Sequence, residues 1–300
     1  MSRLRLPLAF QWRSLSAPFA KPVLLPRGIE RTPILLTLPP MVEQLETYGR
    51  LAAVRCIEAA RAQQRVPVGV AVGLRCPRDG RQGWINGIRR GLEDVLGRFG
   101  LELDFGVTEE GPLLLTLAVE AKARPKALSL PRAGQKLWLT RPLGSDVLVE
   151  AFHRQVRTAS QTRQWLEKSD HPGPPGPRGE RVLGSQVGLQ GLAGAALSLA
   201  LSAELDVVLD AGALPAWPGA LEHLFAGVQP LSCELNARIL GRRFLVTRGV
   251  SERAAQLALA SEWTGGILWA SDRTEKGVCV GQLRKPRHKP VARLLRALQA

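Results

Sequence analysis

The chain has 300 residues, of which 45% are hydrophobic, so it can bury one large core or two ordinary ones and is not disordered throughout. Its formal net charge of +15 favours an anionic partner, and much of the excess lies in residues 1–35 and 284–300. No apolar run reaches the ~18 residues that a membrane span needs.

The first half of the sequence alternates between helix and strand patterns. Residues 1–33 are broken by proline and are expected to be irregular, whereas apolar side chains recur at helical spacing over 41–64 and 82–99. Gly100 ends the second of these helices. Short apolar runs rich in β-branched residues predict strands at 67–74, 101–107, 113–119 and 136–140.

The second half continues the alternation after a break. Residues 146–156 and 157–168 favour helix, and the density of proline and glycine over 169–181 predicts an exposed loop or linker. Beyond that loop, helices are expected at 188–201, 218–226, 252–259 and 290–298, and strands at 205–209, 243–247, 266–270 and 278–283. The alternation predicts a mixed α and β fold in two halves.

The cysteines and histidines are too scattered to form a recognisable metal or disulfide motif. Cys56, Cys76, Cys233 and Cys279 include no CxxC pair. We therefore expect small buried thiols, no metal site and a reducing compartment, so the predicted location is the cytoplasm. The basic N-terminal segment leaves organelle import as an alternative.

Six segments in collinear order, between about residue 35 and residue 285, resemble one enzyme family. They are YGRLAA at 48–53, LWLTRPLG at 137–144, VGLQGLAGAALSLA at 187–200, LPAWPGALEHLFAG at 214–227, WTGGIL at 263–268 and VGQ at 280–282. The chain thereby resembles selenophosphate synthetase (selenide, water dikinase), within the ATP-binding superfamily that includes aminoimidazole ribonucleotide synthetase and thiamine-monophosphate kinase.

The resemblance implies an α+β, two-domain PurM-like fold. Its N-terminal sheet would form a barrel across a dimer, its C-terminal half would be an α+β sandwich, and ATP would bind near their junction for Mg²⁺-dependent phosphoryl transfer to selenide. The implied parts are a basic segment 1–33, an ATP-binding-like domain 34–141, a C-terminal domain 142–285 with the loop 169–181, and a basic helix 286–300. The turn from Pro142 to Gly144 would be the boundary.

The residues that would carry the implied chemistry are replaced. Arg55 stands in place of the family's Asn, Ala59 in place of its Asp, and Gln186 in place of the acid of its Gly-rich turn. No Cys precedes Cys56, so the reactive Cys is missing from this sequence. The resemblance thus implies a degenerate member without catalytic residues or metal ligands, since Mg²⁺ needs carboxylates at fixed positions.

A vestigial phosphate site is the interpretation of what is left. It would consist of Arg55, Gly106, Thr108 and Gly188, where Gly106 and Thr108 keep part of the family's Gly-Gly-His-Thr segment and Arg55 could pair directly with an anion. No cofactor is expected, and ATP binding without Mg²⁺ stays open. In the alternative without anion binding, Arg55 only lines a solvated cleft that no longer binds a ligand.

Three functions follow as hypotheses. The first is a non-catalytic scaffold or regulatory subunit, as a homodimer or as a heterodimer with a related chain, because strands 67–74, 101–107 and 113–119 are expected to leave an apolar sheet face uncovered. The second is an active ATP-dependent phosphotransferase of the selenide, water dikinase type. The third is a module that binds nucleic acid or another polyanion through its basic ends.

Overall fold

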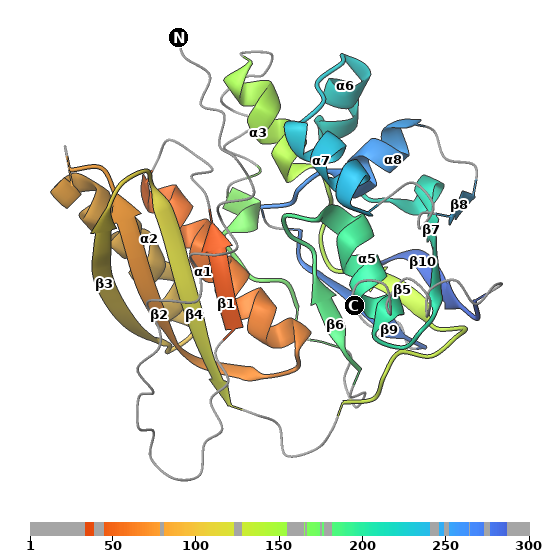
Figure 1. Cartoon of the computed structure of the whole chain (residues 1–300), viewed down its shortest axis with the longest axis horizontal. Coiled ribbons are helices and arrows are strands. Elements are labelled where there is room, and N and C mark those ends of the chain that lie inside the picture. The colour runs from red at the N-terminus through yellow and green to blue at the C-terminus, as the bar shows by residue number, and fades with distance from the viewer. Residues whose placement is uncertain are drawn as a thin grey trace, which may run out of the picture. The chain divides into compact units, whose positions relative to one another are not determined.

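A four-stranded sheet forms the first half of the fold (Figure 1). Its strand order is β1-β4-β2-β3, and β2 pairs antiparallel with β4 but parallel with β3. The strands are β1 (Ile34–Leu38), β2 (Val66–Cys76), β3 (Glu102–Glu110) and β4 (Leu114–Lys122). The computed structural model describes residues 34–38, 45–78, 81–122, 128–154, 165, 167–174, 176, 182–240, 246–248, 252–263, 265–272 and 277–286.

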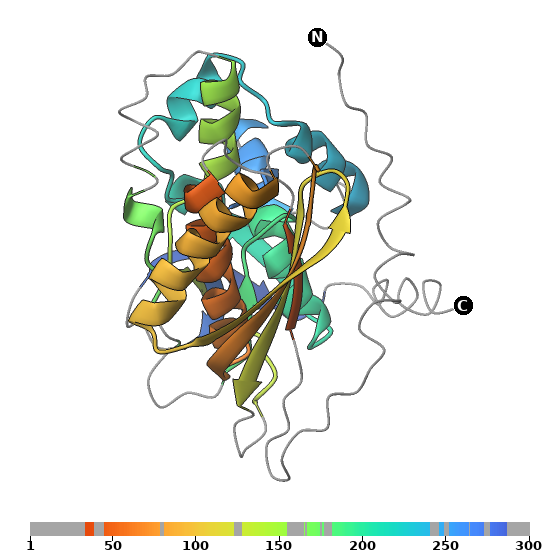
Figure 2. The same cartoon turned by 90° about the vertical axis from the view of Figure 1, so that its left-hand side faces the viewer.

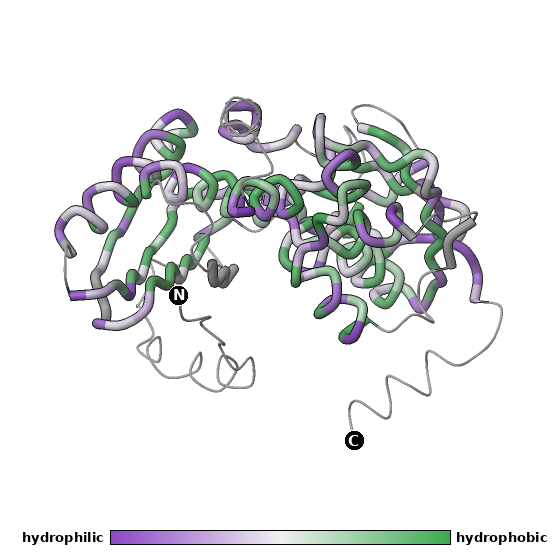
Figure 3. The backbone as a smooth tube through the Cα atoms, turned by 90° about the horizontal axis from the view of Figure 1, so that it is seen from above, coloured by the Kyte–Doolittle hydropathy of each residue, from purple (hydrophilic) through white to green (hydrophobic). Residues whose placement is uncertain are grey.

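Two helices, α1 (Leu45–Ala62) and α2 (Arg81–Arg98), lie on one face of this sheet (Figures 2 and 3). Every second residue of β4 is buried beneath them, as the strand period of two requires. The helices cross closely because glycines remove side chains from the contact. A Cβ at Gly91 would lie 1.9 Å from the backbone oxygen of Glu46, and one at Gly49 would lie 2.2 Å from that of Ile88.

The opposite face of the first sheet is mixed in character. In the two central strands it carries the half-buried apolar side chain of Leu114 together with small or polar residues, for example Gly73 and Thr116, which are register partners, and Glu120. On the edge strand β3, Glu102 and Asp104 are exposed. The period of two directs the larger side chains of β4, such as Leu115 and Leu117, toward the helices, so this face is less apolar in the central strands than the sequence led us to expect.

The second sheet has six strands in the order β6-β9-β5-β10-β7-β8, and β5 lies at its centre between β9 and β10. The chain therefore changes sheet between Lys122 and Lys136, ahead of the turn at Pro142. The strands are β5 (Lys136–Leu139), β6 (Gly184–Gln186), β7 (Asp206–Asp210), β8 (Val246–Arg248), β9 (Ile267–Ser271) and β10 (Val278–Arg284). The exact domain bounds stay a prediction.

Helices accompany the second sheet, and α5 packs directly against β6, β7 and β9. Apart from the short 3-10 turn η2 (Ala211–Ala213), the helices whose bounds lie within the described residues include α3 (Ser145–His153), α5 (Gly191–Leu201), α6 (Ala220–Phe225), α7 (Leu231–Leu240) and α8 (Glu252–Leu259). Helix α5 begins three residues later than expected, because residues 188–190 form a turn with Gly191 at a positive φ of 65°. Neither α7 nor β6 was predicted.

Several sequence-based expectations lie outside the described residues. They are the irregular segment 1–33, most of the helix at 157–168, and the basic helix at 286–300 beyond its first residue. No helix among the described residues is long and apolar enough to cross a membrane. All four cysteines are free, and Cys56, Cys76 and Cys233 are buried, as expected.

Candidate functional site

Helix α1 directs three charged residues toward the second half of the chain. Arg55, Glu58 and Arg61 follow one another at intervals of three, so they share one side of the helix. Arg55 is 4% exposed and Glu58 is 0% exposed. Charged residues are rarely buried without partners, so their contacts decide what this region can do.

Arg55 lies against the turn that precedes α5. A Cβ at Gly188 would lie 2.5 Å from Nη2 of Arg55, so glycine at this position makes room for the guanidinium. Nη1 donates a long hydrogen bond of 3.4 Å to the backbone oxygen of Glu262, whereas Nε is buried without a hydrogen-bond partner. Gln186, expected where the family has an acid, donates from Nε2 to the backbone oxygen of Arg55 at 2.8 Å.

Glu58 ties α1 to two other segments. Its Oε1 accepts from Nε of Arg141 at 3.0 Å and from the backbone nitrogen of Gly173 at 2.9 Å. Arg61 donates to the backbone oxygen of the same Gly173 at 2.6 Å. These bonds link α1 both to the chain just after β5 and to residues 169–173.

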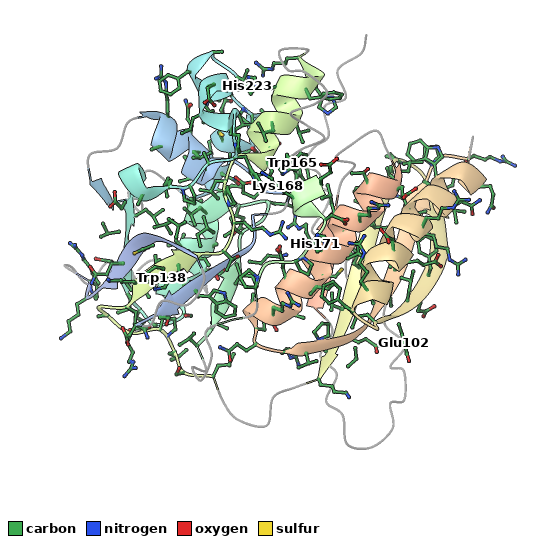
Figure 4. The ribbon with its side chains drawn as sticks, turned by 180° about the vertical axis from the view of Figure 1, so that it is seen from behind. Glu102, Trp138, Trp165, Lys168, His171 and His223 are labelled. Atoms are coloured by element: carbon green, nitrogen blue, oxygen red, sulfur yellow. The ribbon has the colours of Figure 1, made fainter. Side chains whose placement is uncertain are left out.

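The segment that contains Gly173 was expected to be an exposed loop, and its described part is not. Ser169 and Gly173 are buried, and Oδ2 of Asp170 lies 3.1 Å from Nη2 of Arg98 on α2. In Figure 4 the labelled residues Lys168 and His171 mark where the segment passes α1. Proline and glycine exclude regular structure here, but charged side chains of α1 satisfy the backbone groups, so the segment can be buried.

A second buried acid holds the start of α3. Glu262 is 0% exposed and accepts from the backbone nitrogens of Gly144 and Ser145 at 2.5 and 3.0 Å and from Oγ of Ser145 at 2.5 Å. Burial raises the pKa of Glu262 to about 8, and the hydrogen bonds only partly oppose this. Burial likewise raises the pKa of the neighbouring Asp146 to about 6.

The four residues of the predicted phosphate site are not all together. Arg55 and Gly188 are in contact. Gly106 and Thr108 lie in β3, the edge strand of the first sheet, where Gly106 pairs with Gly73. The residues that resemble the family's Gly-Gly-His-Thr segment therefore belong to a strand. No contact among the described residues joins Gly106 to Arg55. Its role in phosphate binding stays a prediction.

Sequence reasoning missed the partners that surround Arg55. It passed over Arg141 and Glu262 altogether, and it considered Glu58 only as a poor substitute for the family's Asp. The one available signal was the position of Glu58, three residues from Arg55 and from Arg61 on the same helix. The contacts of Arg141 and Glu262 join residues far apart in sequence, so no local pattern predicts them.

The side chains of this region do not suit the Mg²⁺ that the resemblance implies. Mg²⁺ prefers oxygen ligands and chiefly carboxylates, but Ala59 offers no side-chain oxygen, and Oε1 of Glu58 is occupied by Arg141 and Gly173. This leaves Oε2 of Glu58, which is buried without a hydrogen-bond partner in the described part of the chain, as a single carboxylate oxygen beside the guanidinium charges. The buried guanidinium of Arg55 would repel a cation. Among the described residues, no group of three or more His, Cys, Asp or Glu side chains could hold a metal ion.

Comparison with known proteins agrees with the resemblance in the sequence. No protein-family model matches the chain. A selenide, water dikinase of Nitratidesulfovibrio vulgaris is 27% identical over 259 residues, which cover 83% of this chain and 74% of that protein. A thiamine-monophosphate kinase of Stenotrophomonas maltophilia superposes with a TM-score of 0.63 at 17% identity, covering 87% of this chain and 85% of the other.

The hydrogenase maturation protein HypE, solved in complex with ATP, superposes with a TM-score of 0.61 at 12% identity and covers 90% of this chain and 81% of its own. At such identities the superpositions establish the fold alone. The chain therefore has the α+β fold that thiamine-monophosphate kinase and HypE share, and in sequence it is similar to the selenide, water dikinases.

Proposed function

We propose that this chain is a selenide, water dikinase-like protein that does not catalyse Mg²⁺-dependent phosphoryl transfer and acts as a non-catalytic scaffold or regulatory subunit. The observation that carries the proposal is the buried guanidinium of Arg55 on α1, packed against Gly188. The resemblance puts a neutral residue there, within a site that would bind a metal with ATP. A fixed positive charge in that place opposes metal binding.

The neighbouring substitutions support the same proposal. Glu58, the acid nearest to the lost carboxylate of position 59, forms an ion pair with Arg141 instead of pointing to a free site. Gln186 replaces a further acid, and its amide is bonded to the backbone of α1. Arg55 and Gln186 each replace a family residue of the site and add a contact between α1 and the second half, whereas Ala59 removes a carboxylate without adding one.

A subunit without catalysis would act through its partners. A solved structure of HypE is a complex with HypF, so at least one protein of this fold works in a hetero-assembly. We propose a homodimer or a heterodimer with a related chain through the first half. The outer face of the first sheet is open to such a contact, because no helix among the described residues covers it, Leu114 and Ala118 are half-buried on it, and the acids Glu102 and Asp104 are exposed at its edge.

The deciding experiment measures phosphoryl transfer from ATP to selenide under anaerobic conditions by ³¹P NMR, with Mg²⁺. An active selenide, water dikinase serves as the positive control. We expect no product from this chain alone, and calorimetry should give the same ATP affinity in Mg²⁺ and in EDTA. Product formation, or ATP binding that requires Mg²⁺, would overturn the proposal in favour of an active phosphotransferase.

That active phosphotransferase is the second candidate function, and the 27% identity with a selenide, water dikinase over most of the chain favours it. A gain-of-function variant tests whether the positions have been matched correctly. Arg55→Asn, Ala59→Asp and Gln186→Asp together remove the guanidinium and return two carboxylates to the site. If the matching is right, ATP binding by this variant becomes Mg²⁺-responsive while the parent stays unresponsive.

A further inference from the structure

Arg55 carries a buried charge that lacks a full set of partners among the described residues. A guanidinium has five N–H donors. Here Nε is buried with no hydrogen-bond partner, and Nη1 makes a single bond of 3.4 Å, at the long limit for an N–H donor. Burying charged donors without acceptors is costly, so a folded protein that retains such a residue needs an acceptor from elsewhere.

The neighbouring charges do not neutralise Arg55. Glu58 is the carboxylate that acts on it, but Glu58 is already in contact with Arg141 at 3.0 Å, and its charge also acts on Arg61. Three guanidiniums thus share one carboxylate. Glu262 contributes only its backbone oxygen to Arg55, since its carboxyl oxygens are bonded at the start of α3. The cluster has a net positive charge, which favours an anion.

The turn beside Arg55 reaches the protein surface within two residues. Gly188 packs against the guanidinium, and Leu189 and Gln190, which follow it, are exposed. Helix α5 begins next, at Gly191, and no side chain caps its N-terminus. The positive end of the helix dipole therefore adds to the potential at the same turn.

We propose that Arg55 and the Gly188 turn form a metal-independent binding site for a phosphate-type oxyanion. The proposal rests on the proposed function, because direct binding by arginine would take the place of binding through Mg²⁺. The anion would accept from the unpartnered nitrogens of Arg55, and the charges of Arg61 and Arg141 would add to the attraction. Inorganic phosphate and the phosphate groups of a nucleotide share this chemistry.

Calorimetry and thermal unfolding of the full chain, with EDTA present throughout, test the site. Inorganic phosphate is the first probe, and we expect it to bind and to raise the melting temperature of the parent chain. Arg55→Met should lose at least tenfold in phosphate affinity. The matched control is Arg89→Met on α2, an exposed arginine that pairs with Glu93 and lies over the Phe105 ring, and this variant should bind phosphate as the parent does.

Two further measurements keep the test decisive. Without phosphate, Arg55→Met should melt at the same temperature as the parent or higher, because an unpaired buried charge has been removed. If this variant fails to fold, Gly188→Ala replaces it, since the added Cβ would displace Nη2 and should weaken phosphate binding. Absence of phosphate binding by the parent, or equal binding by Arg55→Met or Gly188→Ala, would overturn the proposal.

ATP in EDTA is the second probe and separates the two sources of the anion. If the site serves a nucleotide, ATP competes with phosphate and binds more tightly; if it serves a free anion, ATP binds no better than phosphate. Failure of the anion site and failure of the proposed function give different results. Mg²⁺-dependent turnover would overturn that function whether or not phosphate binds. If the chain is inactive and also fails to bind phosphate, only the proposed anion site is overturned.

Discussion

Glu262 should make the stability of this protein depend on pH over an unusual range. In the folded chain burial raises the pKa of its carboxyl from 4.5 to about 8, although three hydrogen bonds from Gly144 and Ser145 favour the ionised form. The folded chain therefore binds this proton more tightly than the unfolded chain does. A group of this kind stabilises fully below its unfolded pKa and loses that contribution as the pH rises toward its folded pKa.

The magnitude follows from the two pKa values. A rise from 4.5 to about 8 corresponds to ~5 kcal/mol, at ~1.4 kcal/mol for each pKa unit. The free energy of unfolding should thus fall between pH 5 and pH 8, with a slope that approaches ~1.4 kcal/mol per pH unit from this group alone. Asp146, whose pKa burial raises to about 6, acts in the same direction at the acid end of this range.

Urea unfolding of the parent and of Glu262→Gln from pH 5 to pH 9 isolates the effect, because other titrating groups largely cancel in the difference. The amide oxygen of the glutamine can still accept from the backbone nitrogen of Gly144, but its NH₂ group then faces the backbone N–H of Ser145. The lost hydrogen bond should lower the free energy of unfolding by ~1 kcal/mol. The variant should be less stable at pH 5 and more stable above pH 8, and Asp146→Asn should remove only the acid part of the slope. A flat difference would refute the reasoning, since it would mean that the hydrogen bonds keep Glu262 ionised.

Three further changes have clear expected outcomes. Gly91→Ala should lower the free energy of unfolding by ~3 kcal/mol, because its Cβ would lie 1.9 Å from a backbone oxygen of α1. Gly97→Ala in the same helix has open space around its Cβ and should raise the free energy of unfolding by ~0.5–1 kcal/mol. Equal effects of the two variants in urea unfolding would contradict the close helix crossing. Glu58→Gln should cost ~3–5 kcal/mol, because it leaves a buried arginine without its counter-charge, and a change below ~1 kcal/mol would contradict the buried ion pair. Iodoacetamide should label Cys279 in the folded chain and not Cys56, whose pKa burial raises to about 12, and mass spectrometry would reveal the opposite order.

Periodicity predicted the elements whose apolar side chains face the core. Helix α8 has the bounds expected from the sequence, and α2 ends close to Gly100. Helix α7 was not predicted because its apolar residues do not mark its buried side. Leu231 and Ile239 are each 68% exposed, while the polar Asn236 is buried and donates to two backbone oxygens, one from the turn before α5 and one at the end of α8. No local pattern reveals such partners.

The candidate site was predictable only in part, for a similar reason. Position in the resemblance singled out Arg55 and Gly188, and the structure places them in contact. The bonds of Glu262 to Gly144 and Ser145 join positions 118 and 117 residues apart, which no spacing rule reaches. The residues around Gly173 were expected in solvent because proline and glycine indicate irregular backbone, but irregular backbone is buried wherever side chains satisfy its polar groups.

The charged residues of α1 depend on one another, and this limits how the lost chemistry could return. Ala59 is 5% exposed and lies four residues after Arg55, so a carboxylate introduced there alone would face the guanidinium on the same side of the helix. It would gain an ion pair with Arg55 and would not become free to bind a metal. Ala59→Asp by itself should therefore raise the melting temperature and leave ATP binding insensitive to Mg²⁺. Only when Arg55→Asn accompanies it does the new carboxylate become available, and an Mg²⁺ response from the single variant would show that Arg55 does not control the site.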